Sequence, residues 1–181
     1  TLLVSLCAIV LSVLIGALMA LAALSKRKVL QTLARLYVEI FRAIPLLVLL
    51  LWVFYGLPVV LGLQLGVFVA GVLSLALSDS AFEAEVFRAG IQSVPKGQVE
   101  AAKSLGLSWI QQMRFIVAPQ AIKVILPALG NQFIYVVKMS SLISVIGLPE
   151  LTRRANELNV NEYRPLEIYS FLVIEYLILI V

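Results

Sequence analysis

The first 25 residues of this chain contain no charged side chain. An apolar helix of about 20 residues is long enough to cross the hydrocarbon core of a bilayer. Because lipid offers the backbone no hydrogen-bond partners, a spanning segment has to be a helix or part of a closed barrel. The segment therefore predicts a transmembrane helix. It lacks the basic start and the small-residue cleavage site of a signal peptide. The chain also begins without Met, so we expect it to be part of a longer chain that lacks a few residues at each end here.

The composition supports the same conclusion for the whole chain. Of its 181 residues, 62% are hydrophobic and 13% are charged, whereas soluble domains have roughly 45–50% and about 25%. We predict an all-α, polytopic membrane protein with about five transmembrane helices, forming a single membrane domain over residues 1–181. The predicted spans cover residues 2–24, 30–55, 67–90, 109–137 and 166–181.

Several local signals refine these spans. Pro45 is expected to kink the second span, and the sequence FYGLP at residues 54–58 is expected to break its helix. Ser108 and Gln111 have the spacing of a capping box, which predicts that the fourth helix begins there. Residues 152–165 are polar and predict an external loop or a surface helix.

The distribution of basic residues predicts the orientation. Cytoplasmic loops of membrane proteins collect Lys and Arg, so the cluster at residues 26–28 places the first loop inside and the N-terminus outside. Five spans then return residues 91–108 to the cytoplasm. Arg153, Arg154 and Arg164 fall outside, against the rule. Topology explains the net charge of +4 better than nucleic-acid binding does.

The residue content excludes several kinds of chemistry. The chain has no His, which removes His-based metal sites and Ser-His or Cys-His catalysis. Its one cysteine, Cys7, has no partner within the chain for a disulfide. No phosphate-binding loop of the form Gly-x-x-x-x-Gly-Lys-Ser/Thr occurs. We therefore predict neither an enzyme nor a cofactor or metal bound by this chain.

The segment VPKGQVEAAKSLGLS, residues 94–108, is the most polar part of the predicted cytoplasmic side. Pro95 favours an extended approach followed by the start of a helix. Gly106 suits the end of that helix, where φ becomes positive. The segment predicts either a short, rigid helix against which a partner docks, or a solvated loop with one helical turn. The candidate contact residues are the small or outward-facing ones: Glu100, Ala101, Ala102, Lys103 and Gly106.

The spacing in this loop resembles the EAA signature of the membrane subunits of bacterial ABC importers. Glu100-Ala101-Ala102 is followed by Gly106, Ile116 and Pro119 in the register of that signature, and Ala118 stands where Leu is usual. The sequences LYVEIFRAIPLLVLL, AEVFRAGIQSVPKGQVEAAKSLGLS and NQFIYVVKMSSLISVIGLPELT are similar to the polar amino-acid branch of the family. Two departures are Ala43-Ile44 for the usual Gly-Thr and Met139-Ser140 for the usual Asp-Thr.

The resemblance implies a fold, a function and a set of partners. The fold is the MetI-like importer fold. The function is that of a permease subunit that carries a polar amino acid into the cytoplasm across the bacterial inner membrane. The loop at residues 94–108 would form a coupling helix that docks on a separate ATPase dimer, which holds ATP and Mg. The remaining partners would be a second permease subunit, identical or homologous, and an extracytoplasmic solute-binding protein.

Polar residues inside the predicted spans are candidates for the solute pathway. Asp79 and Glu83 share one helix face and could accept from an ammonium group. Lys138, Asn131 and the Ser140–Ser141 backbone could donate to a carboxylate. With Gln132 included, the candidate pathway residues are Asp79, Glu83, Asn131, Gln132, Lys138, Ser140 and Ser141.

Structural roles remain open for several charges of these spans. Glu83, Glu85 and Arg88 could form structural pairs near the cytoplasmic interface. Arg35, Glu39 and Arg42 lie on one helix face, where they could pair with each other. Glu175 would pair with a neighbouring helix or face a subunit interface.

Two other functions compete with the importer. The chain could be an ion-coupled secondary amino-acid transporter that works without ATP, with the intramembrane acids as ion sites. It could also be a membrane-bound structural or receptor subunit with no transport. The sequence leaves the solute open, because the acids favour a basic or zwitterionic amino acid and Lys138 favours an acidic or amide one.

Overall fold

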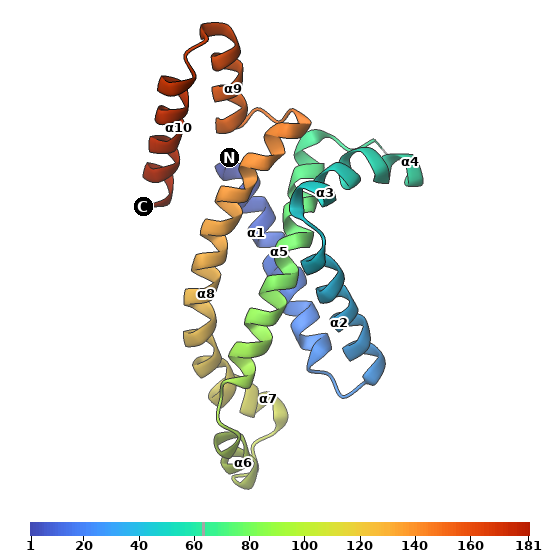
Figure 1. Cartoon of the computed structure of the whole chain (residues 1–181). Coiled ribbons are helices and arrows are strands. Elements are labelled where there is room, and N and C mark those ends of the chain that lie inside the picture. The colour runs from blue at the N-terminus through green and yellow to red at the C-terminus, as the bar shows by residue number, and fades with distance from the viewer. Residues whose placement is uncertain (63) are drawn as a thin grey trace.

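The computed structural model describes residues 1–62 and 64–181, and within them every regular element is a helix (Figure 1). The α-helices are α1 Leu2–Ala23, α2 Lys28–Ala43, α3 Leu46–Leu51, α4 Leu57–Leu61, α5 Val67–Gln92, α6 Lys96–Ser104, α7 Trp109–Gln112, α8 Ala118–Met139, α9 Leu151–Glu162 and α10 Pro165–Ile180. Two π-helical turns, Trp52–Gly56 and Met113–Val117, and a 3₁₀ segment, Ser140–Ile146, join some of these helices end to end.

Three continuous helices are long and apolar enough to cross a membrane among the described residues: Leu2–Ala23, Val67–Gln92 and Trp109–Ile146. They confirm the first, third and fourth predicted spans. A bent pair, Lys28–Ala43 with Leu46–Leu61, qualifies as a fourth span when it is taken together. The helix α10 corresponds to the fifth predicted span.

The second predicted span is broken rather than kinked. Its two halves meet at an angle of 100°. Ile44 and Pro45 both have extended backbone, with ψ values of 122° and 134°. Proline disfavours the helical region for the residue before it, so the helix stops at Ala43 and starts again in a new direction at Leu46.

The sequence FYGLP does not break the helix as expected. The helix continues from Leu46 to Leu61 and ends at Gly62, whose φ is +66°. The π-helical turn Trp52–Gly56 directly precedes Pro58. Local π-type turns help to re-satisfy the backbone groups that a proline frees. The π-helical turn Met113–Val117 has the same position before Pro119.

The helices α1 and α5 form the centre of the molecule. Small residues recur every fourth position along the buried face of α1, at Ala8, Ser12, Gly16 and Ala20. A Cβ atom on Gly16 would lie only 2.8 Å from Cβ of Glu83. Small residues let two membrane helices approach backbone to backbone, and this approach holds α1 against α5. In Figure 1, α2 and α8 flank α5 on opposite sides.

The two ends of the molecule carry different segments. The loop that joins α1 to α2 and the helix α6 lie at the same end, and the N-terminus and α9 lie at the other (Figure 1). This placement agrees with the predicted topology, in which the first loop and residues 91–108 share one side. The helix α9 confirms the surface-helix alternative for residues 152–165.

Candidate coupling surface and membrane-embedded polar site

The helix α6 is closed at its C-terminal end by a Schellman motif. Gly106 N–H donates to the Lys103 carbonyl at 3.0 Å, and Leu107 N–H donates to the Ala102 carbonyl at 3.2 Å. This pattern requires a residue with positive φ just beyond the helix, and Gly106 has φ of +76°. The predicted positive φ of Gly106 at the end of this helix is confirmed. The helix begins after Pro95, whose backbone is extended at ψ of 130°.

The next helix starts two residues later with the predicted capping box. Gln111 N–H donates to the Ser108 hydroxyl at 3.4 Å, and Ser108 N–H donates to Oε1 of Gln111 at 2.8 Å. Four residues separate the end of α6 at Ser104 from the start of α7 at Trp109. Hydrogen bonds satisfy some of the free backbone groups on both sides. This arrangement makes α6 a compact, well-defined projection.

The candidate contact residues of α6 divide between two faces. Glu100, Ala101, Lys103 and Gly106 are exposed, as expected for a docking surface. Ala102 is only 3% exposed, so its small size serves packing within this chain rather than close approach by a partner. The coupling role of all five residues stays a prediction.

Three large apolar side chains extend this exposed surface beyond α6. Leu105, Trp109 and Ile110 are 81%, 68% and 69% exposed. The sequence analysis did not single them out, although their clustering within six residues beside the polar loop was a visible signal. Exposed apolar side chains that gather in one place favour contact with a partner protein.

Packing connects α6 to the long helix α8. Val94, Val117, Ala121 and Ile125 form a small apolar cluster at the base of the projection. In addition, Nε2 of Gln120 donates to Oε1 of Gln98 and to the Ile116 carbonyl. The base of α6 is therefore joined to the start of α8 by side-chain contacts as well as by the chain.

A second candidate site lies where α1, α5 and α8 meet inside the apolar part of the molecule. Asp79 is 2% exposed. It accepts a hydrogen bond from the Ser12 hydroxyl at 2.8 Å and another from Nε2 of Gln132 at 2.7 Å. A buried carboxyl group needs such partners. The sequence analysis did not predict a role for Ser12, because it is one of the small residues that recur along the buried face of α1.

Glu83 lies one helical turn from Asp79 and is fully buried. Neither of its carboxyl oxygens has a hydrogen-bond partner among the described residues. Gly16 lies directly against its Cβ atom. The structure therefore brings together Asp79, Glu83 and Gln132 from the predicted pathway set. Both acids are buried, and Gln132 is partly exposed.

The other predicted pathway residues do not join this cluster. Asn131 and Lys138 are exposed and make no side-chain hydrogen bond or ion pair with it in the described part of the chain. The hydroxyls of Ser140 and Ser141 donate to the Val137 and Lys138 carbonyls, each at 2.8 Å. These hydroxyls are therefore already engaged within their own helix.

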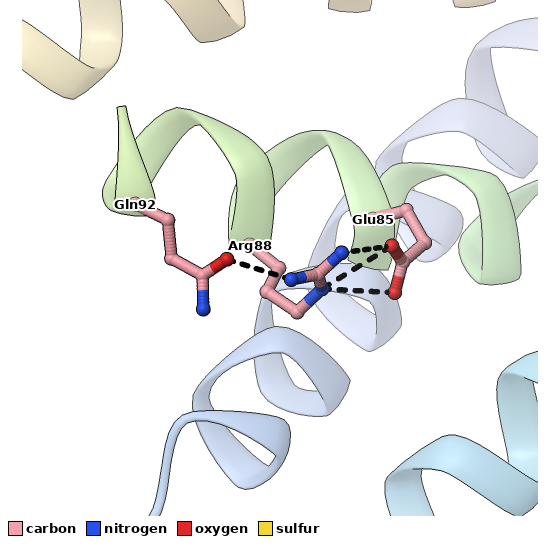
Figure 2. Close-up of polar contacts among 3 residues, drawn as sticks. All are labelled: Glu85, Arg88 and Gln92. Atoms are coloured by element: carbon pink, nitrogen blue, oxygen red, sulfur yellow. Dashed lines mark hydrogen bonds and ion pairs between the residues drawn. The ribbon is translucent and has the colours of Figure 1, made fainter. Parts of the chain in front are cut away.

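Glu85 and Arg88 form a structural ion pair, which was the predicted alternative to a role in the solute pathway. Figure 2 shows the Arg88 guanidinium between Glu85 and Gln92 on α5. Its Nη2 lies 2.6 Å from Oε2 of Glu85, and its Nη1 donates to Oε1 of Gln92 at 2.7 Å. Glu83, in contrast, takes no part in this pair.

The expected ion pairs among Arg35, Glu39 and Arg42 on α2 do not form within residues 1–62 and 64–181. Glu39 is bound to neither Arg35 nor Arg42. The Arg42 guanidinium instead lies over the ring of Phe82 on α5, 5.1 Å from the ring centre.

A buried acid at the opposite end was also missed. Glu150 is 4% exposed and caps α9 by accepting from Arg153 N–H at 2.7 Å. Its other oxygen accepts from the hydroxyls of Thr1 at 3.3 Å and Tyr176 at 3.2 Å. Glu is not among the preferred N-cap residues, so no local pattern predicts this role. Glu150 joins α1, α9 and α10.

The Asp79 contacts lead to a testable expectation. Replacing Asp79 by alanine should lower the thermal stability of the purified protein, because the Ser12 hydroxyl and the Gln132 amide lose their partner in a dry site. An unsatisfied buried group costs about 1–3 kcal/mol. Asp79→Asn, which keeps one acceptor oxygen, should lose less. Equal thermal midpoints for wild type and Asp79→Ala in detergent would contradict the described hydrogen bonds.

A polytopic helical chain with a capped helix projecting from one end and a buried polar cluster between its spans has the architecture of a membrane transport subunit. The chain matches the family described as "Binding-protein-dependent transport system inner membrane component" over residues 12–181. It belongs to this family, and it is a permease component of an ABC transport system.

Individual relatives agree with the family. The chain is 42% identical over 179 residues to the probable glutamine ABC transporter permease protein GlnM of Bacillus subtilis (strain 168), covering 99% of this chain and 82% of that protein. It is 40% identical over 163 residues to the putative glutamine transport system permease protein GlnP of Rickettsia prowazekii (strain Madrid E), covering 90% and 75%.

A solved structure confirms the fold. The structure described as "Crystal structure of an amino acid ABC transporter with histidines" matches with a TM-score of 0.91 and 42% identity, covering 98% of this chain and 82% of that one. The predicted all-α, MetI-like membrane fold is therefore confirmed. The family assignment also favours the ATP-driven importer over the ion-coupled transporter.

Proposed function

We propose that this chain carries a polar amino acid into the cytoplasm across a bacterial inner membrane, as one of two permease subunits. A separate ATPase dimer that binds ATP and Mg would drive the cycle, and an extracytoplasmic binding protein would deliver the solute. The observation that carries this proposal is α6, a helix closed at its C-terminal end by the Schellman motif, with Glu100, Ala101 and Lys103 exposed. Such a projection fits a groove on a partner.

The relatives narrow the solute class. Two of them carry glutamine in their names, and the solved structure contains histidines by its description. Both solutes are polar amino acids with an α-ammonium and an α-carboxylate. This chain offers a buried carboxyl cluster at Asp79 and Glu83, and a guanidinium beside Phe82, one helical turn from Asp79 on α5. Those opposite charges suit a zwitterion.

The buried acids are the observation that favours an ion-coupled mechanism. Asp79 and Glu83 are shielded from the surface, and Glu83 has no hydrogen-bond partner in the part of the chain that the structure describes. Proton relays in transporters use buried acids of this kind. The two mechanisms make opposite predictions about the energy source, so one experiment separates them.

The test is uptake into liposomes that contain the permease with its ATPase partner and its binding protein. We expect labelled L-glutamine or L-histidine to accumulate when ATP and Mg are enclosed, and we expect no accumulation with a proton gradient alone. Vesicles with an ATPase that binds but cannot hydrolyse ATP serve as the control. Uptake that follows the proton gradient without ATP would overturn the proposal in favour of the ion-coupled transporter.

A further inference from the structure

Three helices contribute one side chain each to a cluster outside the buried acid site. The Arg42 guanidinium of α2 lies 5.1 Å from the ring centre of Phe82 on α5. The ring centre of Phe82 lies 6.5 Å from that of Tyr135 on α8, with the planes inclined by 51°. The attraction between a cation and an aromatic face fixes the position of the guanidinium.

The cluster lies at the level of the buried acid. On α5, Phe82 lies about one helical turn beyond Asp79. On α8, Tyr135 lies about one helical turn beyond Gln132. Asp79 and Gln132 are themselves hydrogen-bonded. Arg42 sits in the last turn of α2, just before the 100° break. In transporters, broken helices and mid-membrane solute sites tend to occur together.

Arg42 forms no ion pair in the described part of the chain, although Glu85 lies near enough to attract its charge. Glu85, on the same side of α5, is already bound to Arg88 (Figure 2). Arg42 is exposed and Tyr135 is 37% exposed. A guanidinium without a close ion pair is costly in a membrane, so the exposed Arg42 favours an anion or water from outside the chain.

We propose that Arg42, held against Phe82, binds the α-carboxylate of the transported amino acid. A guanidinium presents paired N–H groups that match the two oxygens of a carboxylate. The Tyr135 ring forms the adjoining wall. This inference rests on the proposed function and names one ligand-binding residue within it. It adds a carboxylate donor to those predicted from the sequence, which are Lys138, Asn131 and the Ser140–Ser141 backbone.

The test measures binding to the permease–ATPase complex in nanodiscs without the binding protein, which would recognise the solute itself. The probes are L-glutamine and L-histidine and the α-amide of each, in which the carboxylate is replaced. We expect wild type to bind the amino acid at least about tenfold more tightly than its amide, as loss of a charge-assisted hydrogen bond predicts. Arg42→Gln should weaken amino-acid binding by about tenfold and leave binding of the amide unchanged.

Two further variants test whether the effect is specific to the guanidinium of Arg42. Arg42→Lys retains the charge and should lose less affinity than Arg42→Gln. Arg35→Gln removes a guanidinium two turns away on the same helix and should bind both probes as wild type does. If Arg42→Gln weakens both probes equally, or separates the permease subunits on a sizing column, Arg42 has a structural or subunit-contact role and the inference is wrong.

The uptake experiment separates this inference from the function on which it rests. A wild-type complex that accumulates no amino acid with ATP overturns the proposed function and this inference with it. A wild-type complex that accumulates amino acid, while Arg42→Gln binds it with unchanged affinity, overturns the inference alone.

Discussion

Replacing Gly106 by valine is expected to reduce ATP-driven uptake by at least about tenfold. A β-branched residue in the left-handed region costs of order 1–3 kcal/mol, and Gly106 has φ of +76°. The strain would be relieved by opening the two hydrogen bonds that end α6, from Gly106 N–H to Lys103 and from Leu107 N–H to Ala102. The docking surface would then lose its fixed shape.

A second glycine of the same helix provides the matched control. Gly97 has ordinary helical backbone, and a Cβ atom there would have nothing within 4 Å. Gly97→Ala should therefore leave uptake unchanged. The measurement is accumulation of labelled amino acid in liposomes, with ATP hydrolysis followed in parallel. Wild-type uptake by Gly106→Val would show that the closed end of α6 plays no part in coupling.

Replacing Gly16 by leucine should prevent stable folding of the permease. A Cβ atom at Gly16 would meet Glu83 Cβ at 2.8 Å, the Ser80 carbonyl at 3.0 Å and the Ala84 nitrogen at 3.1 Å. Two of these atoms belong to the backbone of α5, which cannot move aside as a flexible side chain can. Overpacking typically costs about 1–3 kcal/mol, and a leucine adds three further carbon atoms to the contact.

Gly130 is the control for this variant. It lies within α8, and a Cβ atom there would have no neighbour within 4 Å. Gly130→Ala should be obtained in wild-type yield and elute as wild type does from a sizing column, whereas Gly16→Leu should be degraded or aggregate. Recovery of a monodisperse Gly16→Leu protein with the wild-type thermal midpoint is incompatible with the described α1–α5 packing.

The features predicted correctly from the sequence depend on local rules. The first span was placed at residues 2–24 and is Leu2–Ala23, because an uncharged run of that length has one stable state in lipid. The Ser108–Gln111 capping box and the positive φ of Gly106 follow from residues within one turn of each other. No distant contact was needed to infer them.

The features predicted wrongly or missed depend on contacts between helices. Pro45 allows either a kink or a full break, and a proline by itself does not specify the 100° angle between the two halves. The burial of Ala102 depends on which side of α6 packs against the rest of the chain. The partnership of Ser12 with Asp79 depends on the register between α1 and α5, which a stripe of small residues leaves undetermined. For the same reason the sequence placed Arg42 in a structural ion pair rather than over Phe82.

The Glu150 contacts have a mechanical consequence at the end of the molecule opposite α6. One carboxylate fastens the start of α9 to Thr1 at the head of the first helix and to Tyr176 in the last. A load applied to α9 is therefore shared with two other helices, α1 and α10. The surface helix has to carry α1 and α10 along as it tilts, or break every one of these bonds together.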